Sequence, residues 1–154
     1  MKMSTLSSLF VLMSVVTMIA IAPSAFADHQ SATVTNAPGS ATPGCEETNN
    51  CFIPSTVTID TGGTVTWDNT DTAAHTATGG TATDGPSGVF DSSLIMAGGS
   101  FTHEFTEAGT FDYFCMVHPW MAGTVIVEDA AAAAAEAAEA AEAAAADAAA
   151  ADAA

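Results

Sequence analysis

Basic side chains are almost absent from this chain. Among its 154 residues, Lys and Arg together number 1, Asp and Glu number 18, and the formal net charge at pH 7 is −17. Lys2 is that single base. Because proteins neutralise phosphate with Lys and Arg, the composition argues against nucleic-acid binding and against electrostatic attachment to anionic lipid. Two explanations that do not exclude each other fit the acidic charge: a saline habitat that screens self-repulsion, and a protein partner with a basic face that is steered by long-range attraction.

Long apolar runs are also scarce, and the clearest one lies near the N-terminus. Residues 9–22 (LFVLMSVVTMIAIA) follow a basic residue and precede Pro23 and the small-x-small sequence of residues 25–27. This pattern is typical of a secretory signal peptide, and the run is shorter than the ~20 residues that a membrane span requires. We therefore predict a signal peptide at residues 1–27. The mature protein is expected to be exported and soluble, in the periplasm or at the cell surface, without a membrane span.

Cysteine occurs three times, at Cys45, Cys51 and Cys115. In an oxidising compartment, the short spacing in CEETNNC predicts a local disulfide between Cys45 and Cys51. Cys115 is then left over, and an unpaired thiol outside the cytoplasm is oxidised unless it is buried or bound to a metal. The odd cysteine is the first indication of metal chemistry.

Residues 28–129 alternate apolar and polar side chains in short stretches. The alternation is clear in STVTIDT and GTVTWDN, and again in GSFTHEF, GTFDYFC and GTVIVED. A further short strand is expected at residues 32–36, and the pairs Gly79-Gly80 and Gly98-Gly99 are expected at turns. Six or more short strands without a helical period predict an all-β, antiparallel β-sandwich formed by one domain.

The last segment, residues 130–154, has low complexity, with 20 Ala and five acidic residues. Alanine has the highest helix propensity, and the segment exceeds the ~12–15 residues at which an isolated helix becomes marginally stable. Its apolar side chains are all methyl groups. We expect a frayed, solvated helix or a spacer, and neither a membrane anchor nor a recognisable docking motif.

The sequence YFCMVHPWMAG places a thiolate, an imidazole and a thioether close together, as Cys115, His118 and Met121. One more imidazole completes the set of two histidines, one cysteine and a weak axial methionine that characterises type-1 copper. His75 is the natural candidate, because it follows the strand at GTVTWDN and can reach the same end of a sandwich. Taken alone, C-x-x-H also fits half of a zinc site, but the remaining histidines do not provide the second pair that zinc needs.

These stretches resemble the cupredoxin (type-1 blue copper) family over roughly residues 52–128. The resemblance includes FIPSTVTIDTGGTVTWDNTDTAAH, FDSSLIMAGGSFTHEF and EAGTFDYFCMVHPWMAGTVIV, in which order, spacing and strand context agree. The ligand-loop spacing is closest to that of the amicyanins, with plastocyanins and halocyanins as relatives. The resemblance implies an eight-stranded Greek-key sandwich with one copper ion near its end. His75, Cys115 and His118 would be the equatorial ligands and Met121 the axial ligand.

Some positions depart from the pattern of related families. Plastocyanin-like chains often have a Tyr immediately before the ligand Cys, whereas this chain has Phe114 there. Tyr113 shares the parity of Cys115 and is expected to point inward, so a docking patch beside an exposed Tyr is not expected. Thr76 follows the first ligand where Asn is frequent, so hydrogen bonding around the site is expected to differ. Multicopper catalysis is not supported, because Phe114 and Met116, rather than histidines, flank Cys115.

The ligand set and the resemblance together predict a one-electron carrier between redox partners rather than an enzyme. Cu(I) favours sulfur and Cu(II) favours nitrogen, and a mixed ligand set in a rigid sandwich suits both states. Met116, Pro119 and Trp120 are expected to form an apolar collar around a partly exposed His118, and a redox partner would dock there.

Two other functions remain as alternatives. Single-copper redox chemistry on a small molecule requires an open coordination position, which exists only if Met121 does not bind. Copper storage or delivery favours flexible Met- or His-rich segments, which the expected mature chain lacks. Of the remaining histidines, His103 is expected in the core or at its rim, and His29 is expected to bind copper only adventitiously.

Overall fold

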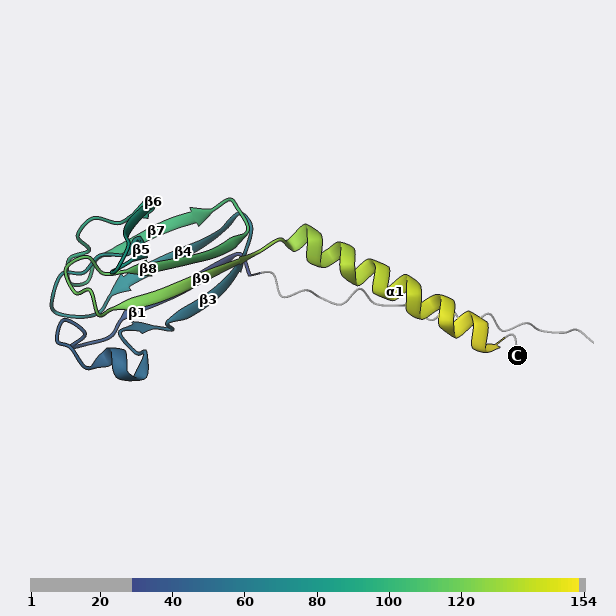
Figure 1. Cartoon of the computed structure of the whole chain (residues 1–154), viewed down its shortest axis with the longest axis horizontal. Coiled ribbons are helices and arrows are strands. Elements are labelled where there is room, and N and C mark those ends of the chain that lie inside the picture. The colour runs from purple at the N-terminus through teal and green to yellow at the C-terminus, as the bar shows by residue number, and fades with distance from the viewer. Residues whose placement is uncertain (1–28, 153–154) are drawn as a thin grey trace, which may run out of the picture.

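The fold is a β-sandwich followed by one long helix (Figure 1). The computed structural model describes residues 29–152, so the signal peptide predicted for residues 1–27 lies outside the described residues. A short 3₁₀ helix, η1 (Cys45–Thr48), follows the first strand, and the tail forms α1 (Ala130–Asp152). Within the described residues the strands are β1 (Ser31–Asn36), β2 (Phe52–Ile53), β3 (Thr56–Asp60), β4 (Gly63–Asn69), β5 (Thr78–Thr81), β6 (Gly85–Asp91), β7 (Ser100–Phe105), β8 (Gly109–Phe114) and β9 (Ala122–Glu128).

The strands form two sheets, which confirms the predicted all-β sandwich. One sheet has the order β2-β1-β4-β7 and the other has the order β3-β9-β8-β5-β6. Two neighbouring pairs, β1–β4 and β3–β9, run parallel, so the expectation of a purely antiparallel sandwich is wrong. Between β1 and β4 the chain crosses to the other sheet as β3, and a crossover of this kind permits parallel neighbours. Alternation identifies the strands but does not specify the direction of their neighbours.

The apolar positions of the alternating stretches face inward, between the two sheets. Val65 and Trp67 of β4 are fully buried, as is Val125 of β9. The ring of Trp67 packs against Tyr113 at a centroid distance of 5.3 Å. Tyr113 is itself only 1% exposed, which confirms that it points inward. A close-packed core with aromatic contacts of this kind gives a rigid support for the loops at each end of the sandwich.

Gly79 and Gly80 lie inside β5 and not at a turn, so the turn prediction for this pair is wrong. A Cβ atom on Gly79 would lie 2.8 Å from Ser87 Oγ and 3.1 Å from the ring of Phe90, both on the neighbouring β6. The two strands therefore approach too closely for a side chain at this position, which is a common reason for glycine inside a strand. Gly98 does lie in a turn, with a positive φ of 74°.

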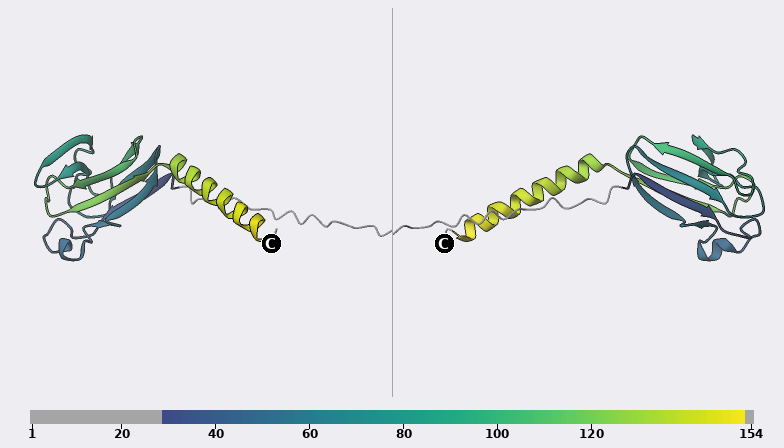
Figure 2. Two further views of the ribbon diagram at one scale, coloured as in Figure 1. Left: turned by 45° about the vertical axis from the view of Figure 1, so that its right-hand side comes forward. Right: turned by 180° about the vertical axis from the view of Figure 1, so that it is seen from behind.

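The alanine-rich tail forms the helix α1, which extends away from the sandwich (Figures 1 and 2). Asp129 precedes the helix, and its Oδ1 accepts the backbone N–H groups of Ala131 and Ala132 at 3.0 and 3.2 Å. An acidic side chain at this position is a favourable N-cap. Across residues 29–152, no helix combines the length and the apolar character needed to cross a membrane.

Candidate metal centre

The candidate ligands lie in two loops at one end of the sandwich. His75 lies between β4 and β5, and its backbone exchanges hydrogen bonds with Ile95 at 3.1 and 2.8 Å. Cys115 follows β8 directly, and Met121 precedes β9. The backbone N–H of Cys115 donates to the carbonyl of Met121 at 3.1 Å, and the N–H of Met121 donates to the carbonyl of His118 at 2.9 Å. Local hydrogen bonds therefore hold Cys115, His118 and Met121 in one loop. The packing of the sandwich brings the fourth candidate ligand, His75, to the same end.

Three potential ligand atoms converge in this region. The Sγ atom of Cys115 lies 3.8 Å from Nδ1 of His75 and 3.6 Å from Nδ1 of His118, and the two nitrogens are 3.1 Å apart. A first-row metal ion with bonds of about 2.0 Å to nitrogen and about 2.3 Å to sulfur, spread by about 120°, separates nitrogen from sulfur by about 3.7 Å and two nitrogens by about 3.5 Å. The observed separations match these values, with the two nitrogens slightly closer. The three side chains therefore have the spacing needed to hold one metal ion between them.

Asp71 fixes the orientation of His75. Its Oδ2 lies 2.9 Å from Nε2 of His75, and both side chains are buried. When Nε2–H donates to the carboxylate, the lone pair of Nδ1 is directed toward Cys115 and His118, as a metal ligand requires. Asp71 is not among the residues predicted from the sequence. The spacing of four residues in DTAAH is the signal that could have revealed it.

The carboxylate of Asp71 is in turn held in its charged form by its surroundings. Burial alone raises its pKa, but hydrogen bonds outweigh burial and hold the pKa well below its usual range. A carboxylate that accepts several N–H bonds is stabilised as the anion. The donors are the backbone N–H groups of Gly39, Thr72 and Ala41 and the imidazole of His75.

The side chains of Cys115 and Met121 are both fully buried. The backbone N–H of Thr76 donates to Sγ of Cys115 at 3.3 Å. The Thr76 hydroxyl oxygen accepts the backbone N–H of Met116 at 2.8 Å and the hydroxyl of Thr78 at 3.0 Å. Thr76 therefore links the two ligand loops from the position where Asn is frequent in the family. The backbone of Met121 lies beside that of Cys115 through the hydrogen bond described above, and the axial role of its thioether stays a prediction.

His118 lies at the edge of the site and is only partly buried. Burial lowers its pKa, the neighbouring His75 lowers it further, and Asp71 opposes both. The ring of Trp120 lies 5.3 Å from the His118 ring, and its indole N–H donates to the carbonyl of Ser40 at 3.0 Å. Trp120 is thus partly packed against the protein and also lies against the partly buried His118, so packing and the predicted place in the collar coexist.

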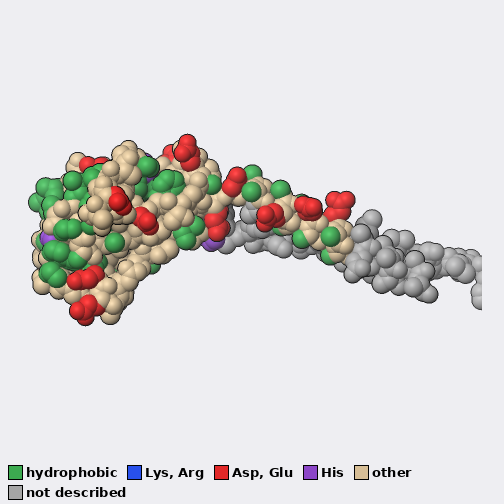
Figure 3. All heavy atoms as spheres, viewed as in Figure 1, with side chains coloured by type: hydrophobic (Ala, Val, Ile, Leu, Met, Phe, Trp, Pro, Cys, Tyr) green, Lys and Arg blue, Asp and Glu red, His purple; other side chains and the backbone are tan. Residues whose placement is uncertain are grey.

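Exposed apolar side chains surround this end of the molecule. Met116 and Val117 are 50% and 47% exposed, and Leu94 and Met96, on the loop that pairs with His75, are 57% and 64% exposed. Pro119 is exposed as well. Figure 3 shows apolar atoms gathered at the end of the sandwich that lies away from the helix. Leu94 and Met96 are not among the predicted docking residues, although the apolar triplet LIM in a polar, glycine-rich segment is a signal for them.

The remaining cysteines and histidines lie outside the candidate metal site. Cys45 and Cys51 form the predicted disulfide, with an S–S distance of 2.06 Å, and Cys115 is the free cysteine among the described residues. His103 is half-buried and stacks at the rim of the core, as expected, and burial lowers its pKa although Glu104 opposes this. His29 lies instead near the ends of β3 and β9, in a group with Asp60 and Glu128.

Comparison with known proteins identifies the family. Residues 40–128 match the profile of the copper binding proteins of the plastocyanin/azurin family. This matched stretch contains every candidate ligand. The chain therefore belongs to that family, the cupredoxins. Copper is the cofactor of the family, and His75, Cys115, His118 and Met121 form its type-1 pattern.

Individual relatives agree with this assignment. The chain is similar to amicyanin from Paracoccus versutus, at 35% identity over 77 residues, covering 50% of this chain and 58% of that protein. It is similar to amicyanin from Paracoccus denitrificans, at 36% identity over 76 residues, covering 46% of this chain and 53% of that protein. It therefore spans little more than half the length of these curated relatives. Among solved structures it is similar to a purple cupredoxin from Nitrosopumilus maritimus, with a TM-score of 0.58, 29% identity, and coverage of 63% of this chain and 99% of that one.

Proposed function

We propose that this protein is a one-electron carrier with a single type-1 copper ion. His75, Cys115 and His118 are the equatorial ligands and Met121 is the axial ligand. The observation that carries the proposal is the convergence of two imidazole nitrogens and one thiol sulfur within 3.8 Å of one another at the end of a rigid sandwich. When bound, copper supplies the Cu(I)/Cu(II) couple, and this mixed set of nitrogen and sulfur ligands suits both states in part.

The surroundings of the site favour electron transfer over substrate chemistry. Cys115 and Met121 are fully buried, and His75 is buried behind Asp71, so the protein excludes water from most of the site. Hydrogen bonds hold the ligand loops in one arrangement, which limits rearrangement between the two redox states. His118 alone among the four reaches toward the surface, and its edge is the natural route for an electron.

A redox partner is proposed to dock at the apolar end of the sandwich. The proposed docking face consists of the collar of Met116, Pro119 and Trp120 around His118, together with Leu94 and Met96, which are exposed on either side of Ile95, the residue paired with His75. The net charge of −17 favours a partner whose rim around an apolar contact is basic. Such a partner would be steered by charge and held by apolar contact.

The protein is also proposed to act outside the cytoplasm. The disulfide between Cys45 and Cys51 is typical of an oxidising compartment, and it supports the signal peptide predicted at residues 1–27. The proposed division of the chain is a signal peptide at 1–27, a cupredoxin domain at 28–129 and an alanine-rich acidic tail at 130–154.

The visible absorption spectrum of the secreted mature protein after addition of Cu(II) tests this function. We expect an intense thiolate-to-copper charge-transfer band that bleaches reversibly on reduction. Cys115→Ser should abolish the band, whereas His103→Gln, at a histidine outside the site, should retain it. A weak spectrum that Cys115→Ser leaves unchanged would contradict the proposal.

The same sample separates a closed carrier from an open reactive site. One similar solved structure is of a purple cupredoxin, so the position of the band should be recorded as well as its intensity. With Met121 bound, added azide should leave the spectrum unchanged. A shift on azide addition would favour single-copper chemistry on a small molecule, the alternative that requires an open coordination position.

A further inference from the structure

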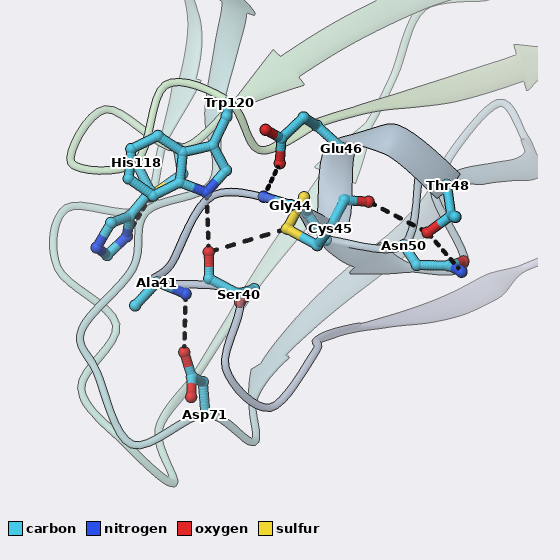
Figure 4. The surroundings of a disulfide bond; sticks show 12 residues. Ser40, Ala41, Gly44, Cys45, Glu46, Thr48, Asn50, Asp71, His118 and Trp120 are labelled. Carbon is cyan, nitrogen blue, oxygen red and sulfur yellow. Dashed lines mark hydrogen bonds between the residues drawn. A yellow bond between two sulfur atoms is a disulfide. The ribbon is translucent and has the colours of Figure 1, made fainter.

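The loop of residues 37–51 lies beside the metal centre although it contains none of the candidate ligands. It connects β1 to β2, and the disulfide between Cys45 and Cys51 closes its second half (Figure 4). At its base, the backbone N–H of Ala37 donates to the carbonyl of Cys51 at 2.9 Å. The two ends of the loop are therefore tied together at the edge of the sandwich.

The first part of this loop forms hydrogen bonds with the carboxylate of Asp71. The backbone N–H of Gly39 donates to Oδ1 of Asp71 at 2.9 Å, and the N–H of Ala41 donates to Oδ2 at 3.3 Å. The same Oδ2 accepts Nε2–H of His75 at 2.9 Å. The carboxylate thus lies between the loop and the imidazole, and the position of the loop determines where the imidazole is held.

Ser40 lies between Gly39 and Ala41 and supports the His118 side of the site. The carbonyl of Ser40 accepts the indole N–H of Trp120 at 3.0 Å, and the Trp120 ring lies against His118 (Figure 4). Three consecutive residues, 39–41, therefore support both histidines through different intermediaries. Ser40 is 1% exposed, so this point of the loop is firmly seated.

The disulfide ties the exposed second half of the loop to the core. Residues 46–50 are exposed, and Asn49 takes a left-handed backbone conformation with φ of 52°. Cys51, by contrast, is only 2% exposed and belongs to the core. A covalent tie from Cys45 to the core restricts the conformations open to the exposed half of the loop. Without it, a segment with so few buried contacts would open locally at low cost.

We propose that the disulfide-closed 37–51 loop is a positioning element of the copper site, which holds His75 through Asp71 and His118 through Trp120. This inference rests on the copper-binding function proposed above. The loop contributes none of the four proposed ligands. It sets the geometry of the two imidazoles by fixing the groups behind them. Loss of a hydrogen-bonding group behind a metal ligand typically lowers metal affinity about 10–100-fold.

A matched pair of glycine variants tests the proposal with the disulfide intact. Gly39 and Gly44 both have positive φ, 84° and 130°, and a Cβ on either would meet no atom within 4 Å. Gly39→Ala and Gly44→Ala therefore strain the same loop without steric clashes. Only Gly39 donates to Asp71, because the N–H of Gly44 bonds to Glu46 instead. Alanine at position 39 keeps the backbone N–H but disfavours the positive φ that directs it at Asp71, so we expect Gly39→Ala to lower copper affinity about 10-fold or more. Gly44→Ala strains the loop away from Asp71 and should change the affinity by less than about 3-fold.

A readout without metal should accompany the affinities. In the metal-free protein, the rate at which a thiol reagent modifies Cys115 reports how tightly the site is held. We expect this rate to rise in Gly39→Ala and in the double variant Cys45→Ser/Cys51→Ser, and to stay near the wild-type rate in Gly44→Ala. The charge-transfer band of the copper-loaded Gly39→Ala and double variants should shift in position or intensity ratio.

The outcomes separate this inference from the proposed function. If the wild-type protein shows no charge-transfer band, the copper function itself fails. If the wild type shows the band and the two glycine variants have equal copper affinity and equal Cys115 reactivity, the positioning role is overturned. If the double variant does not fold, the glycine pair still decides the question, because both variants keep the disulfide.

Discussion

Replacement of Asp71 by Asn tests how the protein supports its first histidine ligand. The substitution keeps the size of the side chain but removes its charge and turns one acceptor oxygen into a donor. Oδ1 of Asp71 accepts the N–H groups of Gly39 and Thr72, and Oδ2 accepts those of Ala41 and His75. Each oxygen accepts two N–H groups, so whichever oxygen is replaced by an NH₂ group, two N–H donors lose their acceptor and face another donor instead.

The structure sets the size of the expected effect. A buried donor that loses its acceptor costs about 1–3 kcal/mol, so the free energy of unfolding of metal-free Asp71→Asn should fall by at least about 2 kcal/mol. For a domain of about 100 residues, about 2 kcal/mol corresponds to a fall of roughly 8–16 °C in Tm. Copper affinity should fall about 10–100-fold, because the Nε2–H of His75 loses a charged acceptor.

The dependence on pH gives a second signature of the same carboxylate. The pKa of Asp71 is lowered in the folded protein, so its contribution to stability is present above the unfolded pKa of about 3.9 and is lost as pH falls toward the folded pKa. The difference in stability between wild type and Asp71→Asn should therefore be constant near neutral pH and should shrink in acid below about pH 4.

Chemical denaturation of the metal-free protein and competitive copper titration would measure both quantities. Asp112→Asn is the matched control, because Asp112 is exposed and accepts only the hydroxyl of Thr124 among the described residues. If Asp71→Asn behaved like Asp112→Asn in both assays, the assignment of Asp71 as the support of His75 would be refuted.

Other predictions concern the core, the docking face and the tail. Gly123→Ala should lower the free energy of unfolding by about 1–3 kcal/mol, since its Cβ would overlap the Tyr113 ring, and an unchanged Tm would contradict this packing. Met116→Glu should leave the copper spectrum intact but slow electron self-exchange measured by NMR line broadening. Val89→Glu, a comparably exposed control on β6, should not slow it, and equal rates for the two would argue against the apolar docking face. Truncation after residue 129 should change neither Tm nor spectrum, because α1 extends away from the sandwich; a clear loss of either would assign the helix a structural role.

Much of the fold and of the ligand set could be predicted because the signals are local. Alternation at GTVTWDN reports directly on which side chains of β4 are buried, and it was correct for Val65 and Trp67. Cys115, His118 and Met121 lie within a stretch of seven residues, so closing a loop around them requires little more than two backbone hydrogen bonds. The disulfide followed from a short spacing in the same way.

The features that sequence could not supply depend on long-range packing. The donation from Gly39 to Asp71 joins residues 32 positions apart, and that from Trp120 to Ser40 joins residues 80 apart. Neither the type of residue nor its spacing in the sequence indicates such contacts. The parallel pairing of β1 with β4 has the same origin, because it depends on which sheet the intervening strand joins. The glycines of β5 were misassigned because a close approach of two strands selects the same residue as a turn does.

The central claim is that His75, Cys115 and His118 hold one copper ion. The most direct measurement is an anomalous difference map at the copper absorption edge, from crystals of the copper-loaded protein. We expect a single peak between Nδ1 of His75, Nδ1 of His118 and Sγ of Cys115, with Met121 on its axial side. No peak there, or a peak only elsewhere, such as at the group of His29, Asp60 and Glu128, would contradict it.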